Sequence, residues 1–369
     1  MNKDSVRIFA VFLLWFLIIN IFAVIVSNRF NLSKDTAYNW IDDNVGQEKS
    51  WNPIPLHANW DSEWYLDIVD NGYHLEGEYL QNVVFFPLYP FLIKLVSFLM
   101  AGNVVLAGWF LSSLFLFLSL FYLFKIVKEF HQEVSPDRAI IALLIFPTAF
   151  FFNAVYTESL FLFLSLLTFY YSLKGRFLSA GIFGLLASLT RVTGLLLLVP
   201  VFWEYLRRHQ FKIKSVLTAK FLPVMLVPFG TLGFFLYHYF RFGDFLLFFR
   251  IQEEWGRKLW TWKESVELLT NPSVANFALD VFFVLVIILA IYFIFKIRFS
   301  YGLYVLATVL LPLSTGTMMS IGRYILVLFP IYILSASIKN KFVWQAWAFT
   351  SVLLMALYTI LFVNNYWAG

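Results

Sequence analysis

Residues 104–124 read VVLAGWFLSSLFLFLSLFYLF, a run of 21 residues without a charged side chain. At about 1.5 Å per residue, a helix of that length crosses the ~30 Å hydrocarbon core of a bilayer. Similar apolar blocks recur along the 369 residues, of which 61% are hydrophobic and 13% charged. A soluble domain carries ~25% charged residues, so the composition excludes a water-soluble enzyme and a disordered protein. It predicts an all-α polytopic membrane protein.

The cysteine count and the net charge exclude further kinds of chemistry and of binding partner. The sequence contains no cysteine, which removes thiolate catalysis, disulfides and cysteine metal ligands. A net charge of +5 is also found in nucleic-acid-binding proteins, but in membrane proteins the basic excess lies in cytoplasmic loops and sets orientation. We therefore expect membrane lipids, and no nucleic acid, as partners.

Eleven transmembrane helices are predicted in a single integral membrane domain, residues 1–369, with the N-terminus in the cytoplasm. The first block lacks a clear cleavage site and is expected to be a retained anchor. The predicted spans cover residues 8–27, 104–124, 139–155, 157–173, 177–190, 192–206, 221–240, 277–296, 300–317, 324–338 and 342–363.

Two long segments are predicted to lie outside, a first outer loop over 28–103 and a second over 241–276. Within the first, residues 86–100 are apolar but too short for a span and begin with prolines, so an interfacial helix is expected. With that placement, 16 of the 27 Lys and Arg residues share the cytoplasmic side with only five of the 22 acids. This asymmetry supports the predicted orientation.

The densest polar cluster reads WDSEWYLDIVDNGY, residues 60–73. The pattern predicts a helix that begins near Asp61 and is closed by Gly72. Asp61 has two interpretations, an N-cap of this helix or a functional carboxylate. Three further acids fall on one helix face, for which the simplest interpretation is a solvated surface: Glu63, Asp67 and Asp70.

Four ionisable residues lie inside apolar stretches, where a charge is costly and usually functional or paired. Glu204 precedes Arg207 and Arg208 at a cytoplasmic end, where pairing is expected. The other three are predicted near the outer face: Glu158, Arg191 and Arg323. A structural pair of Glu158 with Arg191 and a role in a site both remain open.

Arginines facing one carboxylate on a membrane surface suit transfer from a lipid-phosphate sugar. Arginine holds a phosphate in bidentate fashion, and the phosphate leaves without needing a general acid. One carboxylate can then act as the base that deprotonates the attacking hydroxyl of the acceptor. Substitution at the sugar carbon inverts its configuration.

The sequence resembles the GPI mannosyltransferase II (PIG-V-type) family, and we expect it to be a prokaryotic relative of that family. Six matches occur in family order over about residues 57–330: Trp60-Asp61 with Tyr65 and Gly72-Tyr73, then Phe85-Phe86-Pro87-Leu88-Tyr89-Pro90, Tyr156-Thr157-Glu158-Ser159-Leu160, Ser188-Leu189-Thr190-Arg191-Val192-Thr193-Gly194, Gly243-Asp244 followed by Trp255-Gly256-Arg257, and Arg323-Tyr324 leading to Phe329-Pro330. Trp64 departs from the family, which often has His at that position, so acceptor recognition is expected to differ.

The resemblance implies the C-type glycosyltransferase fold, whose first outer loop carries interfacial helices and the catalytic base. By this resemblance Asp61 is the base and Glu158 a second catalytic acid. The substrate-binding residues that it implies are Arg191, Arg323, Arg257, Trp60, Tyr65 and Trp255.

The expected function is thus an integral membrane mannosyltransferase acting on the non-cytoplasmic face. It would use a polyprenyl-phosphate-linked sugar donor and a glycolipid or glycan acceptor, in the plasma membrane of a prokaryote or the endoplasmic reticulum of a eukaryote. No cofactor is expected, although Asp61 and Glu63 offer an Asp-x-Glu pair to a divalent cation. Two alternatives remain: a transporter or lipid flippase with its substrate path at Glu158, Arg191 and Arg323, and a transferase of the same fold with another sugar or acceptor.

Overall fold

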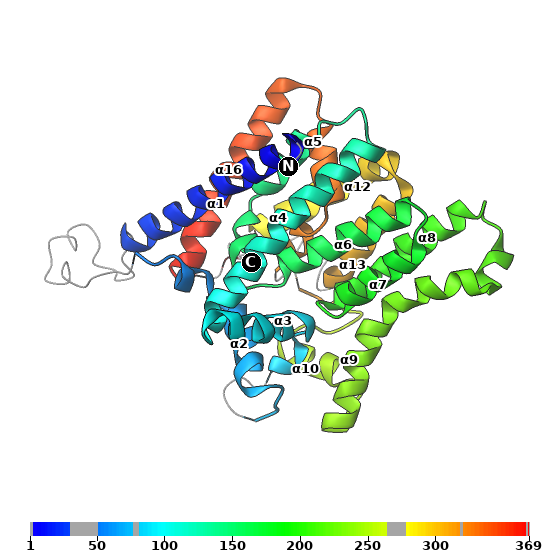
Figure 1. Cartoon of the computed structure of the whole chain (residues 1–369), viewed down its shortest axis with the longest axis horizontal. Helices are drawn as coiled ribbons and strands as arrows, with labels where there is room; N and C mark the ends of the chain where they lie inside the picture. The colour runs from blue at the N-terminus through cyan, green and yellow to red at the C-terminus, as the bar shows by residue number, and fades with distance from the viewer. Residues whose placement is uncertain are drawn as a thin grey trace, which may run out of the picture.

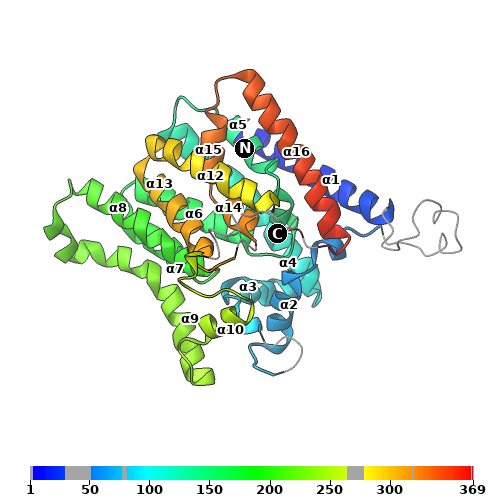
Figure 2. The same cartoon turned by 180° about the vertical axis from the view of Figure 1, so that it is seen from behind.

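The computed structural model describes residues 3–29, 51–76, 81–263, 278–317, 320–366 and 368. Within these ranges every regular element is a helix. The helices pack into one bundle, which Figures 1 and 2 show from opposite sides. Parts of both predicted outer loops, residues 30–50, 77–80 and 264–276, lie outside the described residues.

Apolar helices of very different length make up this bundle. Their bounds are α1 Lys3–Arg29, α4 Val104–Phe130, α6 Glu158–Leu173, α7 Phe177–Ser188, α8 Leu198–Arg208, α9 Leu226–Phe242, α12 Ala278–Ile297, α13 Phe299–Leu313 and α16 Lys341–Val363. α4 packs against α6, α6 against α7, and α7 against α9, so helices that are close in the sequence also pack together. α1 contacts α16, which joins the two ends of the chain.

Among the described residues, four helices are long and apolar enough to cross a membrane. They are α1, α4, the segment Ala219–Phe242 that ends in α9, and α16. The apolar helices Glu158–Leu173, Phe177–Ser188, Val284–Ile297 and Phe299–Leu313 are shorter. The chain is therefore a multi-pass membrane protein by helix length and composition, and the number of eleven spans stays a prediction.

Two predicted spans are interrupted, because proline cannot donate the next helical hydrogen bond and disfavours a helical residue before it. The span expected at 139–155 consists of α5, Pro136–Leu144, and a separate 3₁₀ turn, Ala149–Asn153, on either side of Pro147. The span expected at 324–338 is likewise divided into α14, Ile321–Leu326, and α15, Pro330–Ala336. The break before Pro330 leaves Arg323 in a helix of its own.

α7 and α9 approach closely through glycine. A Cβ atom on Gly230 of α9 would overlap the Ser188 hydroxyl and the Leu185 carbonyl oxygen of α7. The contact is also polar, since Ser188 Oγ donates to Val227 O at 2.6 Å. Packing at this distance places the end of α7, and therefore the start of the Arg191 segment, against α9.

The two predicted outer loops meet at one end of the bundle. There α2, Asp61–Asn71, and α3, Leu88–Ser97, pack together near α10, Leu247–Glu254 (Figure 2). The predicted helix from Asp61 is confirmed, and Gly72 ends it at φ +74°, a conformation that glycine adopts without strain. The placement of 86–100 in the membrane interface stays a prediction.

The predicted solvated face of α2 is wrong for Asp67. This side chain is buried, and its Oδ2 accepts hydrogen bonds from Asn82 Nδ2 at 2.7 Å and His74 Nε2 at 2.9 Å. Asp70 is exposed, as expected. A helical wheel shows which residues share a face but not what covers that face, and here the chain after Gly72 folds back over Asp67.

Candidate active site

Asp61 is held at the start of α2 by its backbone. Its N–H donates to Tyr156 Oη at 3.1 Å, and Tyr156 Oη donates to Asn59 O at 3.1 Å. The preceding residue, Trp60, has φ +57°, a conformation that is unusual for a bulky side chain. The capping interpretation is wrong, because Trp60 occupies the N-cap position and no side chain caps the helix. The Asp61 carboxylate points instead toward Arg323.

A buried polar network fixes the segment just before Asp61. His57 Nε2 lies 2.8 Å from Asn20 Oδ1 of α1, and Asn153 Nδ2 donates to the same oxygen at 3.2 Å. The His57 carbonyl accepts from Val155 N at 2.8 Å. Burial lowers the pKa of His57 to about 3, so the ring is neutral at physiological pH. The network ties the outer segment to two bundle elements without introducing a charge.

Arg323 is the group toward which Asp61 points. Its Nη1 lies 2.5 Å from Asp61 Oδ2 and its Nε 2.8 Å from Glu158 Oε1. The guanidinium also lies over the ring of Tyr156, 4.5 Å from the centroid. The Arg323 side chain is only 6% exposed. One arginine from the second half of the sequence thus bridges two carboxylates from the first half.

Glu158 is the buried anchor of the cluster. It begins α6, where the helix N-terminus favours a negative charge. Its Oε1 also accepts from Arg191 Nη1 at 2.6 Å, so the expected pair with Arg191 is confirmed and shared with Arg323. Its Oε2 is buried without a hydrogen-bond partner among the described residues. Glu158 does not line the cavity described next, and a catalytic role for it stays a prediction.

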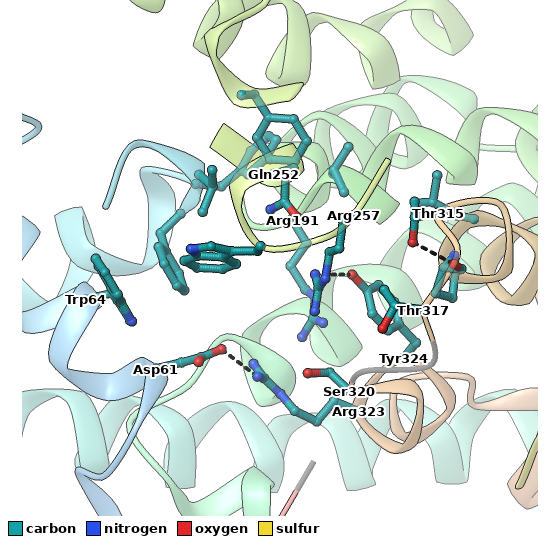
Figure 3. A pocket seen from close by; sticks show the side chains of 18 of the residues that line it. Asp61, Trp64, Arg191, Gln252, Arg257, Thr315, Thr317, Ser320, Arg323 and Tyr324 are labelled. Carbon is teal, nitrogen blue, oxygen red and sulfur yellow. Dashed lines mark hydrogen bonds and ion pairs between the residues drawn. The ribbon is translucent and has the colours of Figure 1, made fainter. Parts of the chain in front are cut away.

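A cavity of about 390 Å³ lies over this charge cluster (Figure 3). Its lining is polar on one side and aromatic on the other. The polar side includes Asp61, Glu63, Thr190, Arg191, Gln252, Arg257, Thr315, Thr317, Ser320, Arg323 and Tyr324. The apolar side includes Trp60, Trp64, Tyr65, Val84, Phe85, Phe86, Val192, Phe248, Phe249, Trp255, Leu259, Leu311 and Pro312. Every residue predicted for catalysis or substrate binding except Glu158 therefore lines one space.

Arg257 closes the polar side opposite Asp61. Its Nη1 donates to Tyr324 Oη at 3.3 Å, as Figure 3 shows. Arg191 lies over the same Tyr324 ring, 5.5 Å from its centroid. No ion pair to Arg257 occurs in the part of the chain that the structure describes. Of the three cavity arginines, Arg257 is thus the one whose charge is not matched by a described carboxylate.

The aromatic side is a packed stack at the meeting of the two outer segments. The ring centroid of Trp64 lies 5.7 Å from that of Phe85 and 5.8 Å from that of Trp255. Tyr65 packs edge-on against Phe85, and its Oη lies 3.3 Å from Thr157 Oγ1. The cavity wall therefore offers rigid apolar area beside fixed positive charge, a surface suited to an amphiphile with an anionic head.

Two further predictions concern Glu63 and Glu204. Asp61 and Glu63 both line the cavity, but residues two apart on a helix do not face each other, which gives the cation-binding alternative no geometric support. Glu204 lies far from the cavity in α8. It pairs with Arg207 at 3.0 Å, as expected, and also with Arg298 at 2.7 Å, so both its oxygens are satisfied.

The sequence interpretation gave no role to Tyr156 and Tyr324. Both lie inside the matched motifs, Tyr156 two residues before Glu158 and Tyr324 directly after Arg323. Tyr156 holds the Asp61 backbone, and Tyr324 contacts both Arg257 and Arg191. Because the chain has 19 tyrosines, only their adjacency to intramembrane charges could have distinguished these two.

Comparison with known proteins shows the fold and the family of the chain. The crystal structure of ArnT from Cupriavidus metallidurans bound to undecaprenyl phosphate is similar with a TM-score of 0.52 and 12% sequence identity, over 96% of this chain and 76% of that one. At this identity the likeness shows a shared glycosyltransferase fold. A search of curated proteins finds no significant match. The family model described as Mannosyltransferase (PIG-V) matches residues 4–255. This match covers more than half of the chain, which therefore belongs to the PIG-V mannosyltransferase family of glycosyltransferases.

Proposed function

We propose that the protein transfers mannose from a polyprenyl-phosphate donor to a hydroxyl of a glycolipid or glycan acceptor, with inversion, on the non-cytoplasmic face of its membrane. The observation that carries the proposal is the cavity itself, where Asp61 faces arginines beside an aromatic wall. The similar structure of ArnT with bound undecaprenyl phosphate supports a donor of this class.

In the proposed reaction the acceptor hydroxyl oxygen attacks the anomeric carbon of the donor. Asp61 takes the hydroxyl proton as the new C–O bond forms. The bond between the anomeric carbon and the phosphate oxygen breaks, and its electron pair leaves with polyprenyl phosphate. Such a displacement requires a carboxylate to take the proton and cationic groups to stabilise the leaving phosphate, and both kinds of group line this cavity.

The ion pairing at the cavity leaves a cation for a donor phosphate. Asp61 and Glu158 pair with Arg323 and Arg191, whereas Arg257 has no carboxylate partner among the described residues and can meet the negative charge of a phosphodiester. Arg323 contributes by turning from Asp61 toward the phosphate, which also frees the Asp61 carboxylate to face the acceptor hydroxyl.

The decisive experiment follows the sugar. Purified protein in liposomes is incubated with polyprenyl-phosphate mannose labelled in the sugar and with extracts of candidate acceptors. We expect labelled mannose in a new glycoside, with equimolar release of polyprenyl phosphate. The variant Asp61→Asn provides the inactive control. Movement of intact donor across the bilayer without bond cleavage would instead identify the transporter alternative.

The same assay shows which sugar donor the protein prefers. Parallel reactions contain polyprenyl phosphates that carry glucose or an aminosugar at the same concentration. We expect mannose to be transferred fastest. Faster transfer of another sugar would retain the reaction type and replace the donor, which is the alternative of a transferase with different specificity.

A further inference from the structure

A cluster of positive charge outside the active site occupies the segment between α8 and α9. We name residues 207–222 the basic hairpin. It contains Arg207, Arg208, Lys212, Lys214 and Lys220, and the sequence has no Asp or Glu between Glu204 and Asp244. Figures 1 and 2 show it in green, projecting from the flank of the bundle away from α2. None of these residues lines the cavity.

The basic hairpin is a folded element with one anchored face. Tyr205 Oη donates to Ser215 O at 2.9 Å and so holds the turn Ile213–Leu217 to the end of α8. Phe221 and Val216 pack into a small separate core with Tyr205 and Val201. The chain therefore has a defined inner side here.

The outer side of the basic hairpin carries exposed apolar side chains. Leu217 is 86% exposed, Ile213 79% and Leu222 66%. These side chains alternate with Lys212, Lys214 and Lys220 over little more than ten residues. Apolar side chains among lysines, presented by an anchored backbone, are the pattern of a segment that lies in a membrane interface.

We infer that the basic hairpin inserts into the headgroup region of the membrane and binds anionic phospholipid. Two observations favour lipid as the occupant. The hairpin leads directly into Ala219–Phe242, a helix long and apolar enough to cross the membrane, so the headgroups lie within its reach. Its unbroken positive charge complements anionic headgroups, while Ile213, Leu217 and Leu222 fit the acyl boundary just below them.

The cysteine-free chain allows a direct test. Leu217→Cys is labelled with bimane and the full-length protein is reconstituted with a fixed fraction of lipid brominated near the top of the acyl chain. The brominated lipid is either phosphatidylglycerol or phosphatidylcholine. Gln132→Cys, an exposed site in the α4–α5 connection, is the matched control. We expect quenching at Leu217, stronger with phosphatidylglycerol, and little at Gln132.

The triple variant Lys212→Gln/Lys214→Gln/Lys220→Gln tests the charge. Each basic residue near an anionic surface strengthens attraction roughly fivefold, so the preference for phosphatidylglycerol over phosphatidylcholine should fall by more than about tenfold while quenching by both lipids persists. Equal quenching by the two lipids in the parent would overturn anionic recognition. Bimane at Leu217 that stays accessible to aqueous iodide and insensitive to either lipid would overturn insertion and leave another macromolecule as the occupant. Both of these outcomes are measured on the protein without the triple substitution, so the test does not depend on the folding of the triple variant.

Discussion

At the scale of single residues, Asp61 carries the sharpest prediction. Asp61→Asn keeps the shape of the side chain but removes the proton acceptor, so transfer should fall about 10²–10⁴-fold. Thermal unfolding of the variant should show a modest loss, because the ion pair with Arg323 is also removed. The rate of mannose transfer and the binding of donor are measured side by side.

Glu63→Gln is the matched control for Asp61→Asn, since Glu63 lines the same cavity two residues later. It should retain most activity, and a chelator should not affect the parent. Equal loss in both variants together with chelator sensitivity would favour the divalent-cation alternative over a general base.

Substitutions of Arg257 and of Arg323 should change different kinetic parameters. Arg257→Lys removes the forked guanidinium but leaves the described carboxylates paired, so we expect a higher KM for donor with a smaller effect on kcat. Arg323→Lys disturbs Asp61, Glu158 and the phosphate together and should lower kcat as well. Initial rates over a range of donor concentrations distinguish the two, and identical kinetics would contradict the assignment.

Much of this site could be predicted from the sequence, because Arg191 and Arg323 are conspicuous charges inside apolar stretches and Asp61 lies in the densest polar cluster. Arg257 is indicated only by the family resemblance. Asp61, Arg191, Arg257 and Arg323 were each identified and do line one cavity. Their pairing could not be predicted, since Asp61 and Arg323 are 262 residues apart. Nor does any spacing show that Arg191 and Arg323 bind the same oxygen of Glu158.

At the scale of helices, the contact of α7 with α9 gives a stability prediction. Gly230→Ala places a methyl group against the backbone of Leu185, and overpacking of this kind costs about 1–3 kcal/mol. Gly233 of the same helix has open space around it, so Gly233→Ala should leave the Tm unchanged or slightly raised. Thermal unfolding in one detergent compares them, and equal Tm values would contradict the close approach.

Helix breaks were harder to predict than helices. Hydropathy locates apolar blocks because membrane helices need about 20 such residues, and the long helices were found this way. The division of 139–155 and 324–338 depends on single prolines and on partners that accept the freed backbone groups. The Leu326 carbonyl, for example, cannot receive a hydrogen bond from Pro330 and accepts one from Tyr332 Oη instead.

At the scale of the whole molecule, the predicted orientation can be measured. Single cysteines at Asp70, Gln132 and Lys339, all exposed, are treated with an impermeant thiol reagent on intact cells. We expect labelling at Asp70 only, because the basic connections should be cytoplasmic. The nearby Ser135 is not chosen for substitution, because its side chain caps α5. Labelling of Gln132 from outside would invert the orientation.

The sharing of Glu158 by two arginines also sets an order of events during biosynthesis. Arg191 follows Glu158 by 33 residues, whereas Arg323 follows it by 165. At 5–20 residues per second, roughly ten to thirty seconds of translation separate Glu158 from Arg323. Throughout that interval Arg191 is the partner available to the nascent carboxylate. Until codon 323 is translated, Glu158 can pair with Arg191 but not with Arg323, so ribosomes stalled before that codon should carry a chain that is inserted yet unable to form its active site.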